Sequence, residues 1–339
     1  MVVINPMQLL VREVLLNSPV LDYVLHHNRV PHALISGDYE NIKWLVFEIA
    51  NICHYPSLVN ARVTLVGNQS QDQMKMLIEE FPKIDEVIEL SNISKPSTTM
   101  TEKDFESLDV TAIFISEKMV ECSHVTAFHL YRLSHINGIG DINISMFNFG
   151  CGPDDIYDTK ILKKVKRIDF NMFNESCIID YLDTYDLVAK SIHDYYQQQY
   201  GGVDEFESLS ETLKMSNRYQ AYHTKVKLGY LGYTATVKPR EVSENLLHKQ
   251  KEIVYSKLQL DTLAQMEKRR WNAERLLGGW VYAPERNNDL KIHNLLVPWE
   301  EIEEKEKEKD RSTVANITNT IATLDFCITK NESYGLDEK

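Results

Sequence analysis

Residues 263–311 read LAQMEKRRWNAERLLGGWVYAPERNNDLKIHNLLVPWEEIEEKEKEKDR. A degraded copy of this stretch occupies residues 187–218, which read LVAKSIHDYYQQQYGGVDEFESLSETLKMSNR. Gly201-Gly202 aligns with Gly278-Gly279, and from Phe206 to Arg218 the offset to Trp299 and Arg311 is a constant 93 residues. An internal repeat predicts one supersecondary unit used twice, with the copies packed together. We therefore expect a pocket or seam on the pseudo-twofold axis.

The two copies are predicted to be helical. Asp183–Tyr200 and Leu258–Leu277 are long amphipathic stretches, and each runs into a Gly-Gly pair, the usual end of a helix. In the second copy, Trp280–Pro284 and Leu295–Trp299 flank a polar turn, which predicts a small β-hairpin. A further helix is predicted over roughly Trp299–Asp325.

The first half of the chain predicts an α/β fold. Short apolar runs alternate with helical patterns near residues 41–53, 73–81 and 120–135, and a leading helix is expected over roughly residues 7–26. Strands separated by single helices imply βαβ units and a parallel sheet. The predicted strands are His32–Ser36, Arg62–Val66, Glu86–Leu90, Thr111–Ser116 and Ile144–Phe149.

This pattern, over about Val30–Gly150, resembles the Rossmann-like (TrkA-N-like) domain of Trk-type potassium-transport regulators. A dinucleotide site needs a glycine-rich turn after the first strand and an acid after the second. The first turn, Ser36–Asn41, has one glycine, and Asp38 and Glu40 place negative charge where a pyrophosphate would sit. The second strand ends in Gly67–Gln69, without an acid. We therefore predict no bound cofactor and a role as a scaffold or dimerisation surface.

The amino-acid composition argues against several classes of protein. The 339 residues carry a net charge of −13, which argues against non-specific nucleic-acid binding. The five scattered cysteines contain no CxxC pair, so we expect reduced thiols in the cytoplasm and neither a zinc site nor a disulfide framework. No apolar run approaches the ~20 residues of a membrane span.

The second copy carries residues that resemble the ryanodine-receptor (RyR) domain, strongly over Leu258–Phe326 and weakly back to Leu182. Ala283 and Asn294 depart from the family pattern. The resemblance implies a non-catalytic module that binds a ligand or a protein and, in bacterial proteins, senses nucleotide-like or other anionic messengers. The matching residues are Trp271, Glu274-Arg275, Gly279–Tyr282, Pro284–Arg286, His293, Leu296–Trp299 and Glu306–Arg311.

The domains we predict are a Rossmann-like domain at 1–155, a linker at 156–180 and an RyR-type pair at 181–330, with repeats at 181–235 and 255–330. Aromatic rings stack on planar bases, and arginine forks bind phosphate or carboxylate. The alternative is a packed aromatic core whose arginines pair with nearby carboxylates. The candidate ligand-binding residues are Asn217, Arg218, Trp271, Arg275, Trp280, Tyr282, Arg286, His293, Trp299, Lys307 and Arg311.

We expect a non-enzymatic sensor or adaptor that binds a small anionic, nucleotide-like ligand or a phosphorylated group between the repeats. Two alternatives stay open. The first is a protein-interaction scaffold, with a protein partner or as a homo-oligomer, or the cytoplasmic regulatory part of a membrane transporter or channel. The second is a nucleotide-dependent enzyme with chemistry near Cys151, although the sequence has no standard catalytic motif.

Overall fold

The computed structural model describes residues 5–16, 29–117, 120–138, 142–148, 165–169, 175–202, 204–237, 253–324 and 326–330. The chain divides into two compact units. The sheet unit comprises Val3–Cys53 and Val59–Ile178, and the helical unit comprises Met1–Val2, His54–Leu58 and Ile179–Lys339. Cys151 and the rest of its predicted loop lie outside the described residues.

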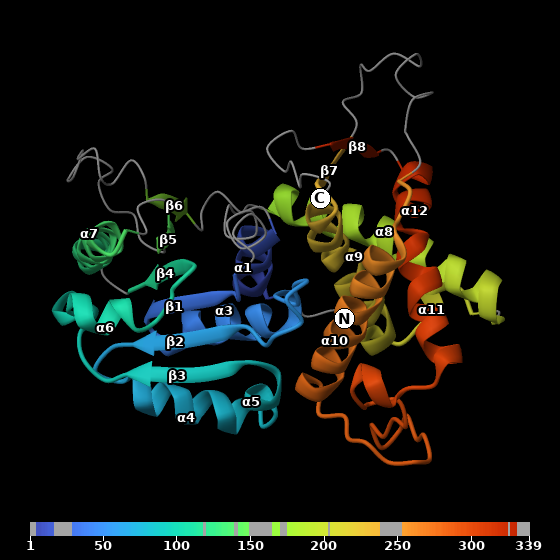
Figure 1. The fold of residues 1–339 in the computed structure, drawn as a ribbon, viewed down its shortest axis with the longest axis horizontal. Helices are drawn as coiled ribbons and strands as arrows, with labels where there is room; N and C mark the ends of the chain where they lie inside the picture. The colour runs from blue at the N-terminus through green and yellow to red at the C-terminus, as the bar shows by residue number, and fades with distance from the viewer. Residues whose placement is uncertain are drawn as a thin grey trace. The chain divides into compact units, whose positions relative to one another are not determined.

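The sheet unit is built on six parallel strands in the order β3-β2-β1-β4-β5-β6 (Figure 1). This confirms the predicted α/β fold class. The strands are β1 (His32–Gly37), β2 (Arg62–Val66), β3 (Glu89–Ile93), β4 (Ala112–Ser116), β5 (Asn143–Asn148) and β6 (Lys166–Asp169). The helices are α1 (Pro6–Leu16), α3 (Tyr39–Ile52), α4 (Ser70–Glu80), α5 (Ile84–Val87), η1 (Ser97–Thr99), α6 (Glu102–Glu106) and α7 (Val120–Ile136).

The central strands are nearly continuous buried runs, as expected for a parallel sheet covered on both faces. All five residues of β4 are buried, and so are the first five of β1. The direction of the strand order reverses between β1 and β4. Right-handed crossovers therefore place α3 and α4 on one face and α7 on the other. The carboxyl ends of β1 and β4 form the topological switch point, where α/β sheets open a crevice.

Two details of the sheet unit differ from the sequence prediction. Lys166–Asp169, which we assigned to the linker, forms the sixth strand, β6. Its four residues include a single apolar side chain, Ile168, so no alternating pattern marks it. Strand β3 begins three residues later than predicted, because Ile84–Val87 form the short helix α5.

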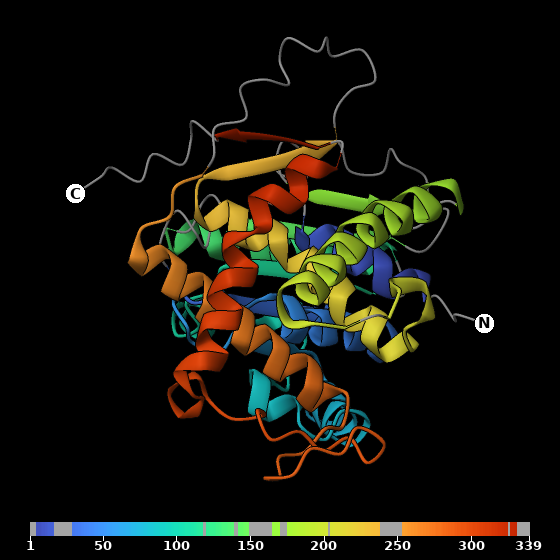
Figure 2. The same cartoon turned by 90° about the vertical axis from the view of Figure 1, so that its right-hand side faces the viewer.

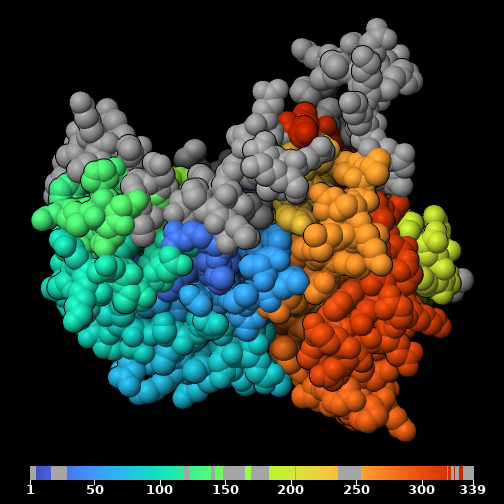
Figure 3. All heavy atoms as spheres, in the orientation of Figure 1, coloured from blue at the N-terminus to red at the C-terminus, as the bar shows by residue number. Residues whose placement is uncertain are grey.

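The helical unit consists mainly of long helices (Figure 2). Helix α10 packs along α11, shown in orange and red, and the second copy presents a continuous packed surface in the same colours in Figure 3. The elements are α8 (Glu175–Tyr200), η4 (Phe206–Ser208), α9 (Glu211–Tyr230), β7 (Tyr233–Val237), α10 (Lys257–Leu277), η6 (Trp299–Glu301), α11 (Glu304–Ala315), α12 (Ile317–Thr323) and β8 (Phe326–Lys330).

The two copies share one order of elements, helix, short 3₁₀ turn and helix. The turns η4 and η6 begin at Phe206 and Trp299, and helices α9 and α11 begin at Glu211 and Glu304. Both pairs are separated by the 93 residues found in the sequence. After the first helix of each copy, a glycine adopts a positive φ, +83° at Gly201 and +78° at Gly279.

The small antiparallel β element lies at a different place from the predicted hairpin. Strands β7 and β8 pair antiparallel, whereas the loop after α10 contains only isolated bridges, from Ile292 to Val281 and to Asn287. Residues 284–291 are all exposed, so this loop has no buried face to hold a strand. The single helix predicted over Trp299–Asp325 is divided into η6, α11 and α12, with Asn316 between the last two.

Candidate functional site

One face of α10 carries a row of basic and aromatic side chains. Lys268, Trp271 and Arg275 are three and four residues apart, the spacing that places helical side chains next to one another. The Lys268 Nζ atom lies 4.5 Å from the Trp271 ring centroid, and the Arg275 guanidinium carbon lies 5.5 Å from it. Trp271 therefore has one cation on each side along the helix.

The Gly278-Gly279 pair ends α10 and turns the chain back towards this face. The Trp280 amide donates to the Arg275 carbonyl at 2.9 Å, the bond of a Schellman motif, and Gly279 supplies the positive φ that the motif requires. The Trp280 ring then lies 4.6 Å from the Arg275 guanidinium carbon. We call Lys268, Trp271, Arg275, Trp280 and His293 the aromatic–basic cluster.

His293 lies next to Trp271 as a neutral imidazole with one N–H donor. Its ring meets Trp271 edge-on at 4.8 Å, and its Nδ1 accepts the Leu295 amide at 3.1 Å. The neutral ring therefore carries its proton on Nε2. Burial lowers the pKa of His293 to about 4, with contributions from Arg286, Arg275 and Lys268.

Two of the N–H donor nitrogens of Arg275 have no hydrogen-bond acceptor among the described residues. Its side chain is buried, with 6% exposed, and its Nη2 donates to the Ser216 hydroxyl at 3.3 Å. Among the described residues, the Nε and Nη1 atoms find no hydrogen-bond partner and are buried, and burial lowers the pKa of this guanidinium. Unfilled buried donors are costly. An oxyanion is the group that an arginine fork matches best.

A chain of buried ion pairs joins α9 of the first copy to α10 of the second. Glu267 accepts from Lys227 Nζ at 2.5 Å, and from Arg270 Nε and Nη2 at 3.0 and 2.8 Å. Arg270 Nη1 also donates to Glu274, which accepts the Ser216 hydroxyl at 2.9 Å. Ser216 therefore connects this network to the fork of Arg275.

The candidate residues Trp299, Lys307 and Arg311 form a second group, between η6 and α11. Lys307 Nζ and the Arg311 guanidinium carbon lie 5.6 and 5.7 Å from the Trp299 centroid. Arg311 also binds Asp261 at 2.6 Å, as well as Glu304 and Glu308. Its charge is therefore engaged within the second copy.

The equivalent arginine of the first copy is engaged in the same way. Arg218 pairs with Asp186 at 2.5 Å and with Glu211 at 3.4 Å, and Glu211 precedes Glu304 by the same 93 residues. The Asn217 amide donates to Leu213 O in its own helix at 3.0 Å. From the sequence, these equivalent residues could either meet in a central pocket or each serve their own copy; the structure holds Arg218 and Arg311 each within its own copy.

The remaining candidates lie on the loop after α10. Tyr282 is 55% exposed. Arg286 Nε donates to Asn288 Oδ1 at 2.8 Å, and its charge contributes to the low pKa of His293. Of the predicted site residues, the structure brings Trp271, Arg275, Trp280 and His293 together.

Sequence reasoning missed two residues of this site. Ser216 comes from α9, and no local pattern links it to Arg275. Lys268 was detectable, because it lies three residues before Trp271 and seven before Arg275 on the same helical face.

Residues 241–330 match the family profile of the RyR domain, so the chain contains an RyR domain that includes the whole aromatic–basic cluster. No curated protein matches the chain. Within the described ranges, no group of three metal-ligating side chains is present. No helix in that part of the chain is both long and apolar enough to cross a membrane.

Proposed function

We propose that this chain is a non-enzymatic sensor whose RyR domain binds a small anionic ligand at the aromatic–basic cluster. The observation that carries the proposal is Arg275, a buried guanidinium between two indoles with two unfilled donor nitrogens. Nε and Nη1 lie on opposite sides of the guanidinium, so two oxygens of an anionic ligand would satisfy them and compensate the buried charge.

The surrounding side chains favour the same ligand class. Among the residues that the structure describes, Lys268, Arg275 and Arg286 have no carboxylate within ion-pair distance. His293 adds a neutral Nε2–H donor, and the aromatic rings offer faces on which a planar base would stack, each stack contributing ~1–3 kcal/mol. A nucleotide-like anion combines the charge and the ring that this set of groups recognises.

The proposed signal passes through Ser216. This hydroxyl joins Arg275 to Glu274, Arg270 and Glu267, and Glu267 holds Lys227 on α9. An anion that draws Arg275 away from Ser216 would change the contact between α9 and α10. The ligand shifts this equilibrium only as far as it prefers one of the two arrangements.

Thermal unfolding tests the proposal with a panel of cyclic AMP, cyclic di-AMP, NAD, ADP-ribose and inorganic phosphate. At 100 times its dissociation constant, a ligand adds about 2.7 kcal/mol to the stability of the unit that binds it. The increase should be lost in Arg275→Gln and kept in Lys305→Gln, a matched loss of charge on the exposed part of α11. No increase with any compound, or an equal loss in both variants, contradicts the proposal.

A second function, a protein-binding scaffold, is favoured by the loop after α10. Val281, Tyr282 and Leu290 are 44, 55 and 67% exposed, and exposed apolar groups in one segment are typical of interaction surfaces. Sedimentation over a range of protein concentrations tests self-association. A rising mass that Leu290→Ser abolishes would support the scaffold function over the sensor.

A further inference from the structure

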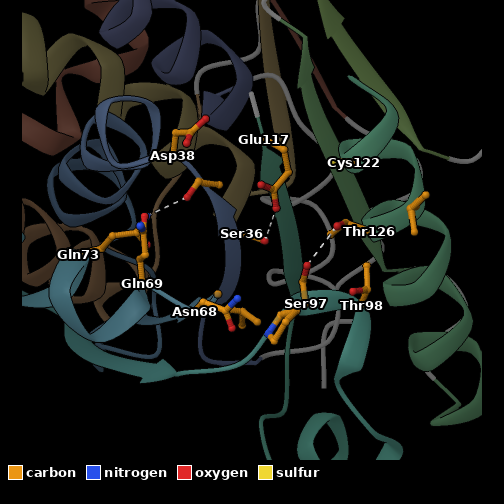
Figure 4. Close-up of a pocket in the computed structure, with 15 residues that line it drawn as sticks. Ser36, Asp38, Asn68, Gln69, Gln73, Ser97, Thr98, Glu117, Cys122 and Thr126 are labelled. Atoms are coloured by element: carbon orange, nitrogen blue, oxygen red, sulfur yellow. Dashed lines mark hydrogen bonds between the residues drawn. The ribbon is translucent and has the colours of Figure 1, made fainter. Parts of the chain in front are cut away.

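The sheet unit contains a cleft of about 560 Å³ at its topological switch point, within the size range of small-molecule sites. Its walls come from the ends of β1 and β4, the loops after β2 and β3, and helix α7 (Figure 4). In this view, Asp38 and Glu117 lie at one end of the cleft, while Gln73 and Thr126 lie on opposite sides.

The described residues that line this cleft carry a net negative charge. Its lining contains two carboxylates, Asp38 and Glu117, and none of the described lining residues is lysine, arginine or histidine. Asp38 Oδ2 is buried and has no hydrogen-bond partner within the described part of the chain, and Asp38 makes no side-chain cap to α3. Glu117 Oε1 accepts the Ser36 hydroxyl at 2.7 Å, which orients this carboxylate. Both carboxylates are thus placed to accept hydrogen bonds from donor groups of a ligand.

This arrangement disfavours a phosphorylated ligand. A pyrophosphate would have to approach the N-terminus of α3 past the Asp38 carboxylate, and the described part of the lining holds no basic side chain to offset the repulsion. The glycine of the turn has another explanation. A Cβ at Gly37 would lie 2.4 Å from Ser116 O, so glycine permits the close packing of β1 against β4.

The rest of the lining suits a flexible aliphatic chain. Val66, Pro96 and Val125 supply apolar surface, and Asn68 and Gln73 supply amide groups. The Gln73 amide is oriented by its bond to Gly37 O at 3.0 Å. A cavity of this size with only two acids is too large and too poor in ligands for a metal ion, and among the described residues no three-ligand group exists.

We propose that this cleft binds a small organic cation of the aliphatic polyamine class. Its ammonium groups would donate to Asp38 and Glu117, and its methylene chain would pack on the valines and the proline. This site is separate from the proposed anion site in the RyR domain, so each can fail without the other.

Isothermal titration of the full chain with spermidine at 150 mM NaCl tests the proposal. Asp38→Asn and Glu117→Gln should each weaken binding by about tenfold or more, because a hydrogen bond to a charged group contributes ~1.5–3 kcal/mol. Glu40→Gln removes the same charge from an exposed neighbour outside the lining and should leave binding unchanged. Arg275→Gln should also have no effect.

Two controls separate specific binding from general attraction to an acidic protein. The thermal midpoints of both cleft variants without ligand show whether they fold. Parallel titrations with adenosine, NAD and Mg²⁺ show which ligand class the cleft prefers. Equal weakening by Glu40→Gln, no measurable binding of spermidine, or tighter binding of NAD than of spermidine overturns the proposal.

Discussion

Glu267→Gln gives the sharpest test of the seam between the two copies. Burial alone would raise the pKa of Glu267, but attraction from Arg270 and Lys227 outweighs burial and lowers the pKa to about 2. Against the ordinary value of 4.5, this shift corresponds to about 3 kcal/mol of stability, at about 1.4 kcal/mol per pKa unit. This stability is present above pH 4.5 and is lost as the pH falls towards 2.

The substitution leaves two buried cations, Lys227 and Arg270, without their shared carboxylate. Breaking a buried ion pair from one side costs about 3–5 kcal/mol, in agreement with the stability that follows from the lowered pKa. We therefore expect Glu267→Gln to lower the unfolding free energy of the helical unit by about 3–5 kcal/mol at pH 7.5.

Urea denaturation followed by tryptophan fluorescence measures this loss. Three of the four tryptophans, Trp271, Trp280 and Trp299, belong to the helical unit, so a Trp44→Phe background makes the signal specific to it. Glu207→Gln is the matched control. It breaks an exposed pair with Lys190 in the same unit and should leave the midpoint unchanged. A loss below about 1 kcal/mol, the level of an exposed pair, would refute the reasoning.

Three further predictions concern other positions in the two units. Glu48→Gln breaks the buried pair with Arg12 that holds α1 to α3 at 2.8 Å; we expect a loss of about 3–5 kcal/mol in the sheet unit, measured by circular dichroism, and a loss under about 1 kcal/mol would contradict this. Gly37→Ala forces a Cβ against Ser116 O and should destabilise the same unit by about 1–3 kcal/mol; an unchanged urea midpoint would show that the strands can separate. Burial, and then repulsion from Glu267, raise the pKa of Asp310 to about 7, so its ionisation should lower stability as the pH rises from about 4 to 7. Between pH 5.5 and pH 7, the unfolding free energy of Asp310→Asn should therefore increase by on the order of 2 kcal/mol relative to that of the unaltered chain. Urea titrations at several pH values measure this difference, and the same pH dependence in both proteins would exclude this role.

The sequence predicted the elements whose patterns are local and repeated. Buried apolar runs marked β1 and β4, helical spacing marked α10, and the duplicated Gly-Gly pair marked the ends of α8 and α10. Strand β6 was missed because its four residues contain one apolar side chain. Its pairing with β5 depends on tertiary contacts that no local pattern records.

The site was only partly predictable for the same reason. Trp271, Arg275 and Trp280 are adjacent on a helix and the turn that ends it, so their proximity follows from the sequence. The pairing of Arg311 with Asp261 and of Arg218 with Asp186 does not, because both of these carboxylates lie on preceding helices. Sequence alone could not distinguish an arginine engaged in ion pairs from one with unfilled donors.

The most direct test of the proposed function is a titration followed by the indole N–H signals of the four tryptophans. Each signal in the nitrogen–proton spectrum can be assigned by a single Trp→Phe substitution. We predict that the anion selected by thermal unfolding shifts the signals of Trp271 and Trp280 and leaves those of Trp44 and Trp299 in place. Shifts confined to Trp299 or Trp44, or no shift at saturating ligand, would contradict the assignment of the anion site to the aromatic–basic cluster.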